Sequence, residues 1–173
     1  MAVRCAIGDV RSEPIVITVM KPEGLNAEAA KALNKAGLAE FFSGNTFNTT
    51  QVTEEKMQRL REFVDRFHDS LYADYATLGL GLIQLKGVED EGWAGKPKYK
   101  PDLATAETYF AALSQSQGSV VKDRATYYLA VCRAKLGEMQ AASAILNALK
   151  NQTADPVLRF KVEDRLRKKL HEP

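Results

Sequence analysis

The chain of 173 residues has few of the residues that build covalent frameworks, metal sites and catalytic groups, with two cysteines and two histidines. Cys5 and Cys132 lack the spacing of a zinc or redox motif, and Cys132 lies in an apolar helical stretch that predicts a buried, inert thiol. A Cys5–Cys132 disulfide is the alternative, and it depends on compartment and geometry. His68 and His171 have no serine, cysteine or aspartate partner at a recognisable spacing. We therefore expect no catalytic group, no metal and no cofactor.

Long apolar runs and a large charge of one sign are missing as well. No segment approaches the roughly 18 apolar residues that a bilayer span requires, so we expect no membrane span. The 24 basic and 22 acidic residues leave a formal charge of +2, which does not indicate nucleic acid as a partner. The basic run at residues 165–169 is explained more simply by the preference of cations for the last turn of a helix.

The first ten residues lack the continuous apolar core of a signal peptide, since Arg4 and Asp9 interrupt them. Two localisations therefore stay open. We expect a cytoplasmic protein if Met1 is the true start, and a periplasmic or otherwise extracytoplasmic one if the chain is a fragment.

Residues 1–24 differ in kind from the rest of the chain. The β-branched stretch at 14–20 predicts a strand, and residues 3–10 predict a second one. Two strands do not make a stable sheet alone. Three arrangements follow: the strands pair with each other against the helices, the edge at residues 15–19 pairs with a second copy to form a homodimer, or the segment is the remnant of a preceding β-sandwich domain.

From residue 25 to residue 173 the apolar residues recur every three or four positions, which predicts helices. We expect helices at residues 27–42, 54–67, 71–85, 102–113, 120–136, 138–150 and 156–170, with N-caps at Asn26, Thr53, Asp69-Ser70, Asp102 and Asp155. The helix at 71–85 is apolar on most sides, which is typical of a helix buried between neighbours. The order predicts three helical hairpins and a terminal capping helix, whose buried side should hold Val157, Phe160, Leu166 and Leu170.

One helix-pair pattern occurs twice, and its earlier copy carries an insertion. The intact copy consists of Leu129-Ala130, Leu136-Gly137, Ala142, Leu146 and Leu149, and the earlier copy of Leu78-Gly79, Leu85, Ala106, Phe110 and Leu113. From Leu129 to Ala142 the distance is 13 residues, whereas from Leu78 to Ala106 it is 28, so the earlier copy is 15 residues longer. Self-similarity at this scale indicates a solenoid of helical hairpins.

These residues resemble the tetratricopeptide repeat, which places a small residue after leucine in its first helix, Leu-Gly at the turn, and alanine before a large apolar residue in its second helix. The resemblance covers roughly residues 53–149, and the first hairpin, at 26–67, lacks the Leu-Gly turn. It implies an all-α chain with a short N-terminal β segment, built as a TPR-like α-α superhelix of about three hairpins plus a C-terminal capping helix, of bacterial type. Peptide-binding members of the family carry basic and asparagine side chains on their concave first helices. The first helices of this chain hold Lys31, Lys35, Asp74, Gln84, Lys122, Arg124, Arg133 and Lys135, from which no carboxylate clamp emerges.

The insertion at residues 86–101 is the best functional candidate in the sequence. It holds the only tryptophan, Trp93, between an acidic half and a basic half that includes Lys96, Lys98 and the aromatic Tyr99. Loops of this length inside compact domains are often functional, and tryptophan and tyrosine on a rim are common interface anchors. The alternative is that Trp93 folds back onto the hairpin.

The favoured hypothesis is a non-enzymatic scaffold that binds a protein or peptide through its concave face and the insertion. The expected partner-binding residues are Trp93, Tyr99, Lys96, Lys98 and Arg133. One alternative is a structural spacer or assembly domain of a larger extracytoplasmic bacterial protein. An enzyme is the third hypothesis, although no residue is assigned as nucleophile, base or metal ligand.

Overall fold

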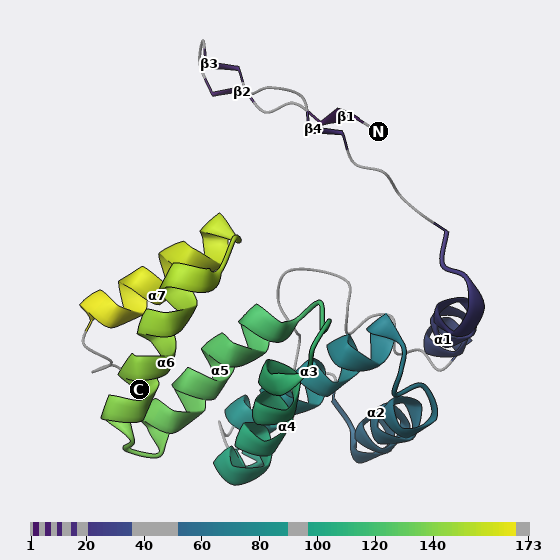
Figure 1. The fold of residues 1–173 in the computed structure, drawn as a ribbon. Coiled ribbons are helices and arrows are strands. Elements are labelled where there is room, and N and C mark those ends of the chain that lie inside the picture. Colours follow the sequence, from purple (N-terminus) through teal and green to yellow (C-terminus); the bar gives the residue numbers. More distant parts are fainter. Residues whose placement is uncertain are drawn as a thin grey trace.

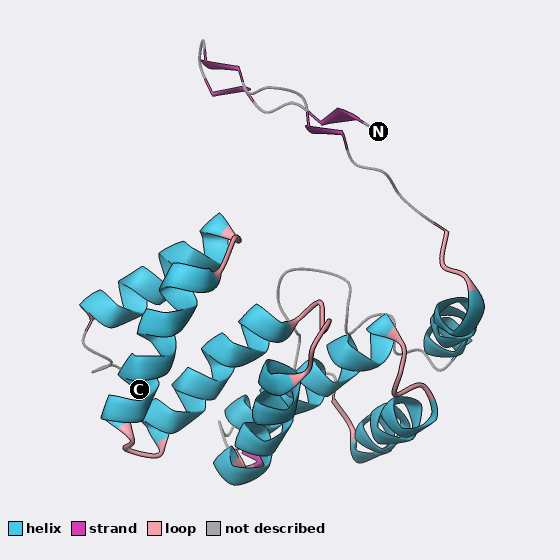
Figure 2. Cartoon of the chain, viewed as in Figure 1, coloured by secondary structure: helices cyan, strands magenta, loops and turns pink. Residues whose placement is uncertain are grey.

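The computed structural model describes residues 2–3, 6–7, 10–11, 15–16, 21–35, 52–89 and 97–168. Its helical part is all-α and repeat-like, which confirms the expected fold class at that level (Figures 1 and 2). The helices are α1 (Gly24–Lys35), α2 (Glu54–Arg66), α3 (Leu71–Lys86), α4 (Leu103–Gln115), α5 (Lys122–Lys135), α6 (Met139–Gln152) and α7 (Pro156–Arg167). Within the described residues, no helix combines the length and the apolar character that a bilayer span needs.

The strands of the described residues are short and pair in antiparallel twos. They are β1 (Ala2–Val3), β2 (Ala6–Ile7), β3 (Val10–Arg11), β4 (Ile15–Val16), β5 (Val88–Glu89) and β6 (Pro97–Tyr99). β1 pairs with β4, β2 with β3, and β5 with β6. The last pair spans the described ends of the insertion at 86–101.

Four of the predicted helix N-caps are confirmed. The side chains of Thr53, Ser70, Asp102 and Asp155 each accept a hydrogen bond from a backbone N–H in the first turn of the helix that follows, at 2.9 to 3.2 Å. Such bonds satisfy donors that have no partner inside the helix. The predicted Leu-Gly turn between α5 and α6 is also present, because Gly137 has a φ of +87°, a conformation that side-chain-bearing residues rarely adopt.

The fifth predicted cap was wrong, because α1 begins at Gly24 and Asn26 lies inside it. The Asn26 side-chain oxygen instead accepts a hydrogen bond of 2.9 Å from the backbone N–H of Leu71, the first residue of α3. Asn26 therefore satisfies a free donor at the start of another helix and ties α1 to α3. The predicted continuation of the first helix beyond Lys35 lies outside the described residues.

The core is a chain of three hydrophobic clusters, each built from three consecutive helices. The first joins α1, α2 and α3, the second α3, α4 and α5, and the third α5, α6 and α7. Helices α3 and α5 therefore contribute to two clusters each. In α3, Leu80 and Ile83 face the first cluster while Leu78 and Leu82 face the second, which explains why this helix is apolar nearly all round.

Close packing between α3 and α4 depends on a glycine inside a helix. A Cβ atom at Gly81 would lie 2.6 Å from Cε1 of Phe110, whose side chain is fully buried. The small residue thus lets the two helices approach. The thiol of Cys132 is also fully buried, as expected.

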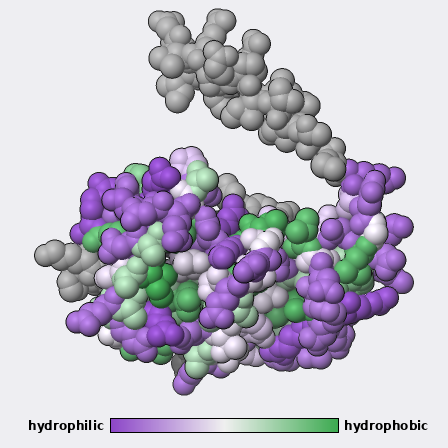
Figure 3. Space-filling model, viewed as in Figure 1, coloured by the Kyte–Doolittle hydropathy of each residue, from purple (hydrophilic) through white to green (hydrophobic). Residues whose placement is uncertain are grey.

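The predicted buried side of the capping helix α7 was partly wrong. Leu158 and Val162 face the third cluster and Leu166 packs against it, whereas Val157 and Phe160 are 62% and 63% exposed. The buried residues recur every four positions, and Val157 and Phe160 lie outside that stripe. Leu170 lies outside the described residues. Figure 3 shows that apolar residues reach the surface in several separate patches among polar ones.

Candidate functional site

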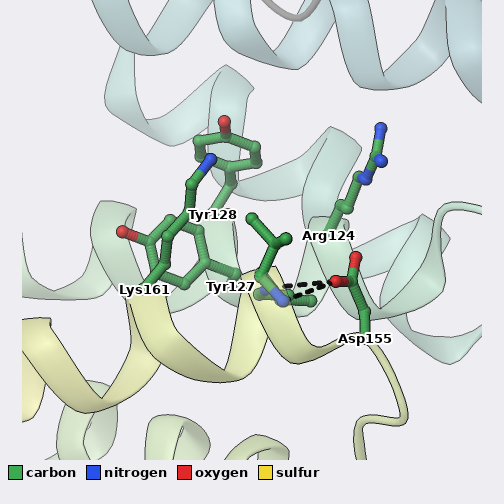
Figure 4. A pocket seen from close by; sticks show the side chains of 7 residues that line it. Arg124, Tyr127, Tyr128, Asp155 and Lys161 are labelled. Atoms are coloured by element: carbon green, nitrogen blue, oxygen red, sulfur yellow. Dashed lines mark hydrogen bonds between the residues drawn. The ribbon is translucent and has the colours of Figure 1, made fainter. Parts of the chain in front are cut away.

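A pocket of about 350 Å³ lies between α5 and α7 (Figure 4). This α5–α7 pocket is lined by Arg124, Tyr127, Tyr128, Asp155, Val157, Leu158 and Lys161. The first three side chains come from α5, and the others come from the start of α7 and the residue before it. Its volume lies at the lower end of the roughly 300–1,000 Å³ range of ligand pockets, so it has room for about one or two side chains.

The wall on α5 is a pair of adjacent tyrosines held by the core. The ring of Tyr128 stacks on Phe110 with 5.5 Å between centroids, and the ring of Tyr127 meets Tyr128 edge-on at 5.3 Å. Burial raises the pKa of Tyr128, the neighbouring Tyr127 raises it further, and the charge of Arg124 opposes both effects. Tyr128 is therefore a neutral hydroxyl at physiological pH, and its ring position depends on Phe110.

The opposite wall is set by the cap of α7. One oxygen of the Asp155 carboxylate accepts hydrogen bonds from the N–H groups of Val157 and Leu158, at 2.9 and 3.1 Å. The guanidinium of Arg159 also donates a hydrogen bond of 2.6 Å to the carbonyl oxygen of Thr153. These bonds fix where α7 starts, and Val157 and Lys161, four residues apart on one face, then point toward α5.

Two cations flank the pocket. In Figure 4 the Lys161 side chain extends from α7 beside the two tyrosine rings, and Arg124 stands on the other side, next to Asp155. Among the described residues, neither Arg124 nor Lys161 takes part in an ion pair. Other cations nearby do: Lys150 lies 3.6 Å from Glu163, and Lys168 lies 3.2 Å from Asp164. The pocket therefore presents two cations that form no ion pair with any described residue.

The residues predicted from the insertion have different settings. Trp93 and Lys96 lie outside the described residues, as does the side chain of Lys98 in β6. Tyr99 is partly buried against the first cluster, and its pKa is raised by that burial and by a hydrogen bond with Glu54. Tyr99 thus contacts the helical array at its α1–α3 end.

Arg133, the remaining predicted binding residue, joins three consecutive helices. Its guanidinium forms ion pairs with Glu107 of α4 and, at 2.6 Å, with Glu138 just before α6. The hydrogen bond to Glu138 is the main cause that raises the pKa of Arg133. The structure therefore places Tyr99 against the α1–α3 cluster and Arg133 between α4 and the start of α6, and neither residue lines the α5–α7 pocket.

Sequence reasoning did not find the α5–α7 pocket, although it singled out Arg124 among the basic residues of the first helices. The pocket joins residues about thirty positions apart, and no local spacing connects Tyr127-Tyr128 with Lys161. The exposure of Val157 could not be found either, because the apolar pattern of α7 placed it on the buried side.

The described residues give this pocket two cations, a carboxylate, two tyrosine hydroxyls and an apolar surface, which are groups that can bind a ligand. The thiol of Cys132 is buried, and burial raises its pKa to about 11, so it stays protonated at neutral pH. No group of three or more histidine, cysteine, aspartate or glutamate side chains within the described residues could hold a metal ion. Comparisons with protein-family models, with curated proteins and with solved structures gave no match for this chain.

Proposed function

We propose that this chain is a non-enzymatic scaffold that binds a protein or peptide partner on the face formed by its first helices. In this proposal α1–α2, α3–α4 and α5–α6 are tetratricopeptide-like hairpins of a superhelix, α7 caps it, and residues 1–24 form a β segment at its start. The duplicated sequence pattern and the three linked clusters support this arrangement. Repeat arrays of this kind generally act by presenting an extended surface.

The observation that carries the proposal is the α5–α7 pocket. It combines rigid tyrosine rings, an exposed apolar residue and two cations that form no ion pair with the described residues, and interfaces favour aromatic and arginine side chains. Val157 is 62% exposed at the edge of the pocket, so its apolar side chain is accessible to a partner. The insertion, with Trp93 and Tyr99, is the second part of the proposed binding surface.

The experiment that tests the proposal is affinity capture from an extract of the source cells. The bait would be the full chain, beside a pocket variant (Val157→Asn with Lys161→Ser), an insertion variant (Trp93→Ala with Tyr99→Ala) and the control Phe160→Asn. Phe160 is the matched control because it is as exposed as Val157 and lies on the same helix, but does not line the pocket.

Each pattern of capture has a definite meaning. A protein retained by the wild type and the control but lost with the pocket variant supports the proposal at this pocket. Loss with the insertion variant alone would move the binding site to residues 86–101. Capture of nothing by any bait would contradict the scaffold proposal.

The alternative proposal is a spacer or assembly domain of a larger extracytoplasmic bacterial protein. The antiparallel pairing of Ala2–Val3 with Ile15–Val16 favours it, because a paired strand segment directly before a helical array suits a junction with a β-domain. The reading frame upstream of Met1 tests it. A β-domain with a signal peptide there would favour the spacer, and a stop codon would exclude it.

A further inference from the structure

We propose that the α5–α7 pocket recognises an acidic peptide segment of the protein partner, with a carboxylate held between Arg124 and Lys161 and an adjacent apolar side chain on Val157 and the tyrosine rings. This inference rests on the proposed scaffold function and names the chemistry of its partner. It comes from the pocket's charge, its walls and the exposure at its edge.

The charge of the pocket selects for an acidic ligand. Among the described residues, the ionised groups that line it are Arg124 from α5, Lys161 from α7, and Asp155 between α6 and α7. One carboxylate oxygen of Asp155 is already occupied by two backbone N–H groups at the start of α7, where the helix dipole also favours negative charge. The two cations, Arg124 and Lys161, outnumber the single carboxylate of Asp155, and neither cation has an ion pair within the described residues.

A carboxylate between these cations would form charge-assisted hydrogen bonds. Such bonds are stronger than neutral ones, and the planar guanidinium of Arg124 suits a carboxylate well. A basic peptide would instead bring a third cation beside Arg124 and Lys161, and like charges placed together at an interface are strongly unfavourable. The positive charge of the pocket therefore favours acidic partners over basic ones.

The walls of the pocket favour a peptide over a small inorganic anion. Tyr127, Tyr128 and Val157 supply an apolar surface beside the cations. An isolated phosphate or carbonate would leave that surface in contact with water. An aspartate or glutamate with a neighbouring leucine, valine or phenylalanine would use both parts, and a volume of about 350 Å³ accommodates two such side chains.

The rigidity of the site reduces the cost of binding. Tyr128 is stacked on the buried ring of Phe110, and the start of α7 is fixed by the Asp155 cap. A preformed wall loses little conformational freedom when the peptide arrives.

The experiment starts with selection from a random library of twelve-residue peptides displayed on phage, with the full chain as bait. The best peptides are synthesised, and their affinity is measured by isothermal titration calorimetry against the wild type, against Arg124→Gln with Lys161→Gln, and against Lys122→Gln with Arg167→Gln. The second pair is the matched control, because its members are exposed cations of the same two helices that do not line the pocket. Circular dichroism verifies that each variant stays folded.

The expected result is enrichment of aspartate or glutamate next to an apolar residue. The pocket variant should weaken the selected peptide about tenfold or more, the control less than about threefold, and added salt should weaken wild-type binding. Replacement of the peptide's glutamate by glutamine should weaken binding to the wild type by a similar factor. The same replacement should change the affinity of the pocket variant little.

Two results would overturn the inference, and they are distinguishable from failure of the scaffold proposal. Selected peptides without acidic enrichment, still weakened by Val157→Asn, would show a binding pocket with another preference and would leave the scaffold function intact. Acidic peptides weakened equally by the pocket and control variants would show general charge attraction only. A library that yields no binder also contradicts the inference, and the capture from cell extract then decides the scaffold function separately.

Discussion

The replacement Gly81→Ala measures how closely α3 and α4 are packed. Its Cβ would lie 2.6 Å from Cε1 of Phe110 and 2.9 Å from Cζ, well inside the ordinary carbon–carbon separation of about 3.5–4.0 Å. Alanine raises helix propensity by about 1 kcal/mol over glycine, whereas overpacking a core costs about 1–3 kcal/mol. The ring is fully buried and stacked on Tyr128, so it has little room to move. We therefore expect the overpacking cost to lie in the upper part of that range, about 2–3 kcal/mol, which leaves a net loss of about 1–2 kcal/mol in the free energy of unfolding.

The assay is equilibrium unfolding in urea, monitored by circular dichroism, with the mutation made in two backgrounds. In the chain carrying Phe110→Leu the colliding ring is absent, so Gly81→Ala should there be neutral or stabilise by up to about 1 kcal/mol. The difference between the two backgrounds isolates the contact. If Gly81→Ala stabilises the wild-type chain by about 1 kcal/mol, the proposed close approach of the two helices is refuted.

Three further perturbations test separate contacts. Asn26→Ala removes the acceptor of the Leu71 N–H and should lower the free energy of unfolding by about 1 kcal/mol; an unchanged urea midpoint would contradict the tie between α1 and α3. In a Cys5→Ser background, Cys132 should resist thiol reagents at pH 8 until the chain unfolds. Because its folded pKa of about 11 exceeds the unfolded value, stability should be full below about pH 8.5 and decrease as pH rises from there toward 11; rapid labelling of the native protein would contradict this. Asp155→Ala removes the cap of α7 and should cost about 1–2 kcal/mol, with faster amide hydrogen exchange in α7 than in α5, and equal exchange in the two helices would argue against the cap.

The helices and their caps could be predicted from sequence because their signals are local. Thr53 and Asp102 precede their helices directly, and each cap bond spans three residues. The apolar character of α3 on most sides likewise indicated a helix shared between neighbours, and it contributes to two clusters. Such signals lie within a few residues of one another, so they can be identified without knowing which helices pack together.

Other features depend on contacts between distant residues and could not be predicted. The side chain of Asn26 is as suitable for capping its own helix as for capping α3, and only the position of α3, 45 residues away, decides between them. The faces of α7 were uncertain for a related reason, since Val157, Leu158, Phe160 and Val162 offer two apolar stripes. The stripe that packs on α5 and α6 is selected by the helices it meets.

The candidate site shows the same limit. The sequence drew attention to the insertion because tryptophan and tyrosine are concentrated there, and Arg133 was named for its charge. In the structure the charge of Arg133 is paired with Glu107 and Glu138, whereas Arg124 on the same helix has no ion pair with the part of the chain that the structure describes. Whether a cation of a helix is available to a partner depends on the acidic residues that the adjacent helices place beside it. The spacing of residues along the sequence does not show this.

The central claim is that a partner binds at the face where α5 meets α7. The most direct measurement is an NMR titration of the ¹⁵N-labelled full chain with the captured partner or the selected peptide. We expect the largest changes in amide chemical shift at Arg124, Tyr127, Val157 and Lys161, with small changes in α2. Changes confined to other helices, or absent at saturating ligand, would contradict the account.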